Sequence, residues 1–160
     1  PLISEVSASF LQQEGYIANC KVKVIEMDYA PESAKNAFTE MAQNRYENKD
    51  LFQLEQNYII NSEPRLNFIC KVIGKIPRNS LVLFHRIEHG KKVYEKLRQE
   101  SNKAVYYVDG GTDKDIREEY KKKMEAGEEV VIVASYGTFS TGISIKKIHN
   151  IFLLILLAIN

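Results

Sequence analysis

The chain has 160 residues, of which 44% are hydrophobic and 27% are charged. These proportions are typical of one globular domain with a buried core, and they exclude a disordered or fibrous chain. The net charge is only +1, but residues 1–64 carry 5 Lys/Arg against 10 Asp/Glu, whereas residues 65–160 carry 17 against 11. The basic second part is compatible with a polyanionic partner, although such surfaces also occur without one.

Several classes of protein have little support in the sequence. Cys20 and Cys70 have no CxxC or Cys/His spacing, which disfavours metal or redox chemistry and predicts buried free thiols. His89 and His149 also lack partners at the spacing of metal ligands. The apolar run 151–159 is about half of the roughly 20 residues that a membrane span needs. We therefore expect no membrane contact, a terminal core strand at this run, and a cytoplasmic location.

The first 76 residues combine one expected strand with two expected helices. Residues 1–20 resemble a connector, and Val22 and Val24 alternate with lysines in a plausible strand over residues 21–27. Pro31 then favours a helix near 32–47, because proline is tolerated in a first helical turn. A polar stretch follows over residues 44–61. Ser62 is a candidate helix cap, followed by a helix through Ile76 with apolar residues at helical spacing.

From residue 80 onward, short apolar strands alternate regularly with helices. We expect strands at 80–84, 104–108, 129–134 and 151–157, and helices at 88–100 and 112–126. This alternation predicts parallel βαβ units and an α/β fold of three layers, with a mostly parallel sheet and helices on both faces. In the second helix Thr112 is the expected hydroxyl cap, and Ile116, Tyr120 and Met124 form an apolar stripe.

The loop after the strand at 129–134 carries the strongest functional signal. It contains the hydroxyl residues Ser135, Thr138, Ser140, Thr141 and Ser144, with Gly137 and Gly142 among them. Ligands of open α/β sheets bind at the carboxyl ends of the strands. Hydroxyl and backbone N–H groups at that edge can hold phosphates, so we expect a phosphate-contacting loop here.

The sequence lacks the motifs that would allow it to hydrolyse ATP by itself. It contains no GxxxxGK[ST] loop and no Asp-Glu dipeptide for a Walker B site, and no GxGxxG, GxSxG or HExxH motif occurs. Without a phosphate-gripping loop and a magnesium carboxylate, the chain alone is predicted to be inactive as an ATPase and to hold neither ATP nor Mg²⁺ stably.

Three segments together resemble the second RecA-like domain of superfamily 2 helicases, from about residue 20 to 153. Residues 81–86 resemble motif IV, residues 107–112 resemble the strand-Gly-x-Thr turn, and residues 131–144 resemble motif V. Ser140–Ser144 is the most specific part. The sequence of motif V is similar to that of helicases of the phage recombination-repair type. The resemblance implies a connector at 1–20 and a second RecA-like domain at 21–160, truncated at its C-terminal end.

In this family two RecA-like domains bind ATP and Mg²⁺ between them and bind single-stranded or branched nucleic acid. The resemblance therefore implies, as partners, such a strand and a first RecA-like domain of the same parent enzyme. It implies contacts to the nucleic-acid backbone by Phe84, His85, Arg86, Gly110, Gly111, Thr112, Ser135 and Thr141, and a position near the nucleotide for Gly142 and Ser144. Phosphate contacts suit a motor that does not read sequence.

Two departures from the family leave alternatives open. Ser144 stands where many relatives have Asp, and no arginine occurs after Arg117, so the Gln-x-x-Gly-Arg-x-x-Arg motif VI is missing. A stand-alone α/β adaptor module that binds a nucleotide or a protein is the second interpretation. A small flavodoxin-like or transferase enzyme is the third, disfavoured because no nucleophile–base pair stands out. The sequence does not distinguish DNA from RNA.

Overall fold

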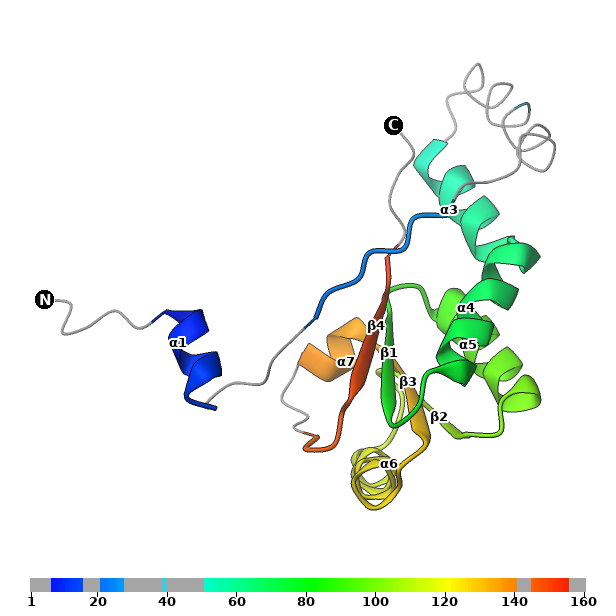
Figure 1. Ribbon diagram of the computed structural model, residues 1–160. Coiled ribbons are helices and arrows are strands. Elements are labelled where there is room, and N and C mark those ends of the chain that lie inside the picture. Colours follow the sequence, from blue (N-terminus) through cyan, green and yellow to red (C-terminus); the bar gives the residue numbers. More distant parts are fainter. Residues whose placement is uncertain (1–6, 16–20, 28–38, 40–50, 141–144, 156–160) are drawn as a thin grey trace, which may run out of the picture.

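The computed structural model describes residues 7–15, 21–27, 39, 51–140 and 145–155. Within this part of the chain, a four-stranded sheet forms the centre of the molecule (Figure 1). Its strands run in the order β2-β3-β1-β4 and pair in parallel throughout. The strands are β1 (Ser80–Phe84), β2 (Ala104–Val108), β3 (Val130–Ser135) and β4 (Asn150–Leu154).

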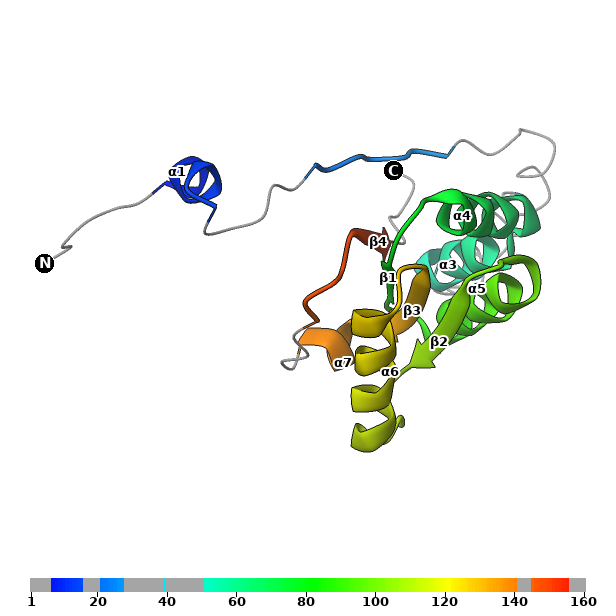
Figure 2. The same cartoon turned by 60° about the horizontal axis from the view of Figure 1, so that its bottom comes forward.

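Helices cover both faces of the sheet, as Figure 2 shows. One face packs against α4 (Glu63–Lys75) and α5 (Ile87–Glu100), and the other packs against α6 (Lys114–Ala126). Helix α3 (Leu51–Asn61) contacts α4, α7 (Tyr136–Ser140) follows β3, and α1 (Ala8–Gln13) stands apart from the sheet. The expected α/β fold with three layers and a parallel sheet is therefore confirmed.

The core divides into two clusters because successive side chains of a strand point to opposite faces. Val82, Phe84, Val131 and Val133 pack against α4 and α5, whereas Leu81 and Ile132 pack with α6. The five apolar residues Val130–Ala134 are all buried, as expected for a central strand covered on both sides.

One buried asparagine joins three elements at the amino edge of the sheet. The amide Nδ2 of Asn79 donates to the carbonyl oxygens of Met124 (2.6 Å), Gly127 (3.1 Å) and Lys147 (3.1 Å). Its Oδ1 accepts the backbone N–H of Val130 at 3.0 Å. Asn79 is completely buried. It therefore ties the end of α6 to the starts of β1 and β3 and to the segment before β4.

Most of the regular elements from residue 62 onward agree with prediction, whereas the strand predicted over residues 21–27 does not form. Strands β1 and β2 have the predicted bounds, β3 is shifted by one residue, and β4 begins one residue early and ends at Leu154. The helix predicted after Ser62 is α4. The second half of the polar stretch at 44–61 forms α3, a helix that was not predicted, and its apolar pair Ile59 and Ile60 is buried.

Two local predictions were wrong. The strand predicted over residues 21–27 does not form, and Val22 and Val24 are more than 80% exposed. A strand needs a partner ladder as well as β-branched residues, and this segment has none among the described residues. The N-cap of α6 is Asp113 and not Thr112, because the hydroxyl of Thr112 is used in the preceding turn. The helix expected at 32–47 lies outside the described residues except for Thr39.

Candidate nucleic-acid interface

The parallel sheet brings the predicted contact segments to one edge. Phe84 at the end of β1 is the register partner of Ser135 at the end of β3, and Val108 of β2 pairs with Ala134. The segments that begin at His85, Asp109 and Tyr136 therefore all leave the sheet at its carboxyl edge. This is the edge at which open α/β sheets bind ligands.

Phe84 is a core residue. Its ring is fully buried and stacks on Tyr107 with centroids 5.6 Å apart. Gly90 of α5 lies so close that a Cβ atom there would be 2.4 Å from the ring. The side chain is consequently unavailable to a nucleic-acid strand, which corrects the expectation for this residue. The two residues that follow it have more accessible side chains.

Arg86 is held in place by helix α3. Its Nε donates to Oε1 of Gln56 at 2.9 Å, and its Nη2 donates to Oε1 of Gln53 at 3.0 Å and also to Gln56. Amide oxygens satisfy guanidinium donors without neutralising the charge. Among the described residues, no carboxylate forms an ion pair with Arg86. The arrangement orients a positive charge at the carboxyl edge.

The turn after β2 makes its own hydrogen bonds. The carboxylate of Asp109 accepts the N–H of Gly111 at 2.9 Å and the hydroxyl of Thr112 at 3.4 Å, and Thr112 Oγ1 accepts the N–H of Asp109 at 3.0 Å. Arg117 donates to the carbonyl oxygens of Thr112 (2.7 Å) and Gly110 (3.4 Å). Two of the donors expected to bind phosphate are thus engaged within the turn. Gly110 and Gly111 remain exposed.

The start of the loop after β3 folds into helix α7. The hydroxyls of Ser135 and Thr138 lie 2.6 Å apart and share a hydrogen bond, and Thr138 is buried. A hydroxyl retains further hydrogen-bonding capacity after one bond, so Ser135 can still contact a phosphate. The remaining predicted residues of this loop, Thr141, Gly142 and Ser144, lie outside the described residues.

His85 and Tyr136 form a stacked aromatic pair between the ends of β1 and β3. Their ring centroids are 5.1 Å apart and the ring planes differ by 10°. Both residues are exposed, Tyr136 to 46%. Neither ring belongs to a core cluster.

Some of the lysines of the second part form ion pairs along helices. Lys121 pairs with Glu118 and Lys123 with Glu119 in α6, and Lys92 pairs with Glu88 in α5. Exposed pairs of this kind contribute about 0.5 kcal/mol or less. The positive charges of Lys121 and Lys123 are therefore offset locally by acidic neighbours.

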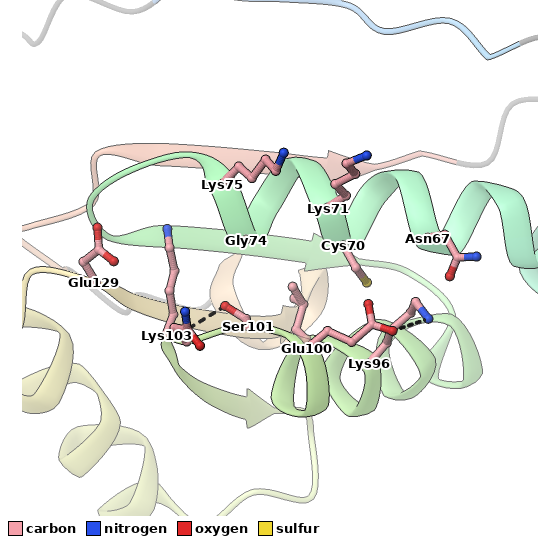
Figure 3. A pocket seen from close by; sticks show the side chains of 12 residues that line it. Asn67, Cys70, Lys71, Gly74, Lys75, Lys96, Glu100, Ser101, Lys103 and Glu129 are labelled. Atoms are coloured by element: carbon pink, nitrogen blue, oxygen red, sulfur yellow. Dashed lines mark hydrogen bonds and ion pairs between the residues drawn. The ribbon is translucent and has the colours of Figure 1, made fainter.

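A hollow of about 650 Å³ lies at the opposite edge of the sheet, between α4 and α5 (Figure 3). Lys71, Lys75 and Lys96 line it, and Lys96 pairs with Glu100 at 2.8 Å. Cys70 also lines it, but burial raises the pKa of its thiol to about 12, so the thiol stays protonated and unreactive. Cys70 is thus the buried free thiol that was expected, whereas Cys20 lies outside the described residues.

His89 has a structural partner. Its Nε2 lies 2.9 Å from Nη1 of Arg65, and both residues are buried. Burial, reinforced by the charges of Arg65 and Lys92, lowers the pKa of His89 to about 4. A neutral imidazole can accept the guanidinium N–H, so this histidine joins α4 to α5. Over the described part of the chain, no cluster of His, Cys, Asp and Glu is suited to a metal ion.

Three residues at the carboxyl edge of the sheet were not predicted from the sequence. Gln53 and Gln56 act from α3, a helix that was expected to be part of a polar stretch. Tyr136 was not predicted as a site residue, although an aromatic residue directly after a buried strand is a usable signal for an exposed ring.

Within the described ranges, no helix is both long and apolar enough to cross a bilayer.

Comparison with known proteins identifies a relative in sequence and in structure, although no family model matches the chain. The ATP-dependent DNA helicase uvsW of Enterobacteria phage T4 is 32% identical over 155 residues, which cover 95% of this chain and 29% of that protein. The crystal structure of T4 UvsW matches with a TM-score of 0.57 and 34% identity, over 71% of this chain and 23% of the UvsW chain. The chain thus spans less than a third of the helicase it matches. The resemblance drawn from the motifs is confirmed: the chain is a homologue of one part of the T4 UvsW helicase and shares its α/β fold.

Proposed function

We propose that this chain acts as the second RecA-like motor domain of an ATP-dependent nucleic-acid helicase, with residues 1–20 as its connector and the domain beginning near residue 21. The observation that carries the proposal is the common edge of the sheet. Three segments that resemble helicase motifs leave parallel strands there, in a chain homologous to a helicase.

The groups at this edge suit a motor that must bind and release a strand repeatedly. Ser135 and the exposed backbone of Gly110 offer neutral donors, and Arg86 offers one oriented positive charge. Contacts of this kind go to the phosphate backbone and carry no sequence information. A cluster of arginine forks would hold the strand more tightly than a stepping motor requires.

Hydrolysis of ATP and Mg²⁺ binding belong, in this proposal, to a parent enzyme with a first RecA-like domain. The described residues offer no metal-binding cluster, and the sequence has no Walker A loop. This chain would contribute the strand-binding edge and, near Gly142 and Ser144, one wall of the interdomain nucleotide site. Recombination and repair are the processes that we propose for the parent.

Fluorescence anisotropy with labelled single-stranded oligonucleotides of several sequences tests the proposal. We expect weak, sequence-independent binding that weakens as salt increases, because phosphate contacts release counterions. Arg86→Gln is expected to lower the slope of log K against log salt by about 0.7, the value for one phosphate contact on a single strand.

Arg98→Gln is the matched control, since it removes the same charge from the exposed, far end of α5. It is expected to leave the slope unchanged. Binding that is absent at low salt, or equal losses in both variants, would contradict the proposed interface.

A further inference from the structure

His85 and Tyr136 form a stacked pair that is exposed at the carboxyl edge of the sheet. The two rings come from segments that follow different strands, 51 positions apart in sequence, and they meet at the carboxyl edge. Tyr136 leaves 46% of its surface accessible, and neither ring is part of a core cluster. An exposed aromatic face is free to stack on a further planar group.

We propose that the His85–Tyr136 pair is a stacking platform for an unpaired nucleobase. This inference rests on the proposed function, because it assigns the bases of the same strand whose phosphates the edge is proposed to hold. Proteins that bind single strands without sequence preference combine cationic backbone contacts with aromatic rings on which bases stack. Arg86, adjacent to His85 and oriented by two glutamines, supplies the cation beside the platform.

The geometry of the pair favours a base over other planar occupants. The rings are nearly parallel, with 10° between their planes, so a third ring can extend the stack. Every base has a π-face, so the contact tolerates any sequence, as a helicase requires. A paired base in a duplex is already stacked on its neighbours. The platform is therefore specific for single-stranded segments.

A backbone without bases separates stacking from phosphate binding. The probes are oligothymidine and an abasic oligonucleotide of equal length, each labelled and titrated at the same low salt. We expect the chain to bind oligothymidine about tenfold more tightly than the abasic strand, a typical effect of one stacked base. Tyr136→Leu should remove this preference and leave binding of the abasic strand unchanged, whereas Tyr136→Phe should keep the preference.

Phe68→Leu is the control, because Phe68 is an exposed aromatic residue on α4. It should change neither affinity, and circular dichroism should show that every variant is folded. Equal binding of both strands by the unmodified chain would overturn the platform while leaving the phosphate-binding edge intact. A failure to bind either strand would overturn both proposals. If the chain shows no base preference and Tyr136→Leu abolishes tight binding to a protein partner, the pair belongs to a protein interface instead.

Discussion

Replacement of Asn79 by alanine should be among the most destabilising single changes in this chain. The side chain is completely buried and makes hydrogen bonds to four backbone groups, with its Nδ2 hydrogens shared among three carbonyl oxygens. The two N–H donors and the acceptor oxygen of the amide make at least three hydrogen bonds at the same time. Each hydrogen bond contributes about 1–1.5 kcal/mol to stability. The free energy of unfolding should therefore fall by about 4 kcal/mol, a large fraction of the 5–15 kcal/mol typical of a domain.

Urea unfolding followed by circular dichroism measures this loss directly. The midpoint should fall with little change in the slope m, since the exposed surface on unfolding is unaltered. Asn79→Asp should cost at least as much, because it removes both donors and turns a carboxylate toward three carbonyl oxygens. Asn102→Ala, at an exposed position before β2, should change stability by about 0.5 kcal/mol or less. A similar small effect for Asn79→Ala would refute the assignment of Asn79 as the link between these elements.

Three further changes test the packing and the site. The pKa of His89 falls from 6.5 to about 4 on folding, so the unfolded chain binds the proton more tightly than the folded chain. As pH falls from 6.5 to about 4, the free energy of unfolding should therefore decrease by about 3 kcal/mol. His89→Gln should remove this pH dependence in urea titrations at several pH values. Gly90→Ala places a Cβ 2.4 Å from a buried core ring and should lower the free energy of unfolding by about 1–3 kcal/mol. Gly74→Ala should raise it by up to about 1 kcal/mol, because the nearest atom to the new Cβ would be 3.8 Å away. Equal thermal midpoints for the two variants would contradict this difference. Gln56→Ala removes the two hydrogen bonds from Arg86 to Gln56 and leaves the one to Gln53. It should weaken oligonucleotide binding about threefold with an unchanged salt slope, and a changed slope would show that the charge itself had moved.

The sequence determined the α/β alternation because each strand and helix from residue 62 onward carries its own local signal. Val130–Val133 is a run of β-branched residues typical of a strand buried on both faces. The motif resemblance rested on short, specific wording such as Ser140–Ser144, and the comparison with T4 UvsW confirmed it. These features depend on residues that are close together in the chain.

The tertiary structure decided what depends on contacts between distant residues. Residues 21–27 have the pattern of a strand, but they pair with no strand in the described part of the chain and do not form one themselves. Phe84 was grouped with its two neighbours by motif, and only the approach of Gly90 shows that its ring is part of the core. The support of Arg86 by α3 and the meeting of His85 with Tyr136 arise from strand order, because adjacency in a parallel sheet is set by packing across the whole domain and not by local propensity.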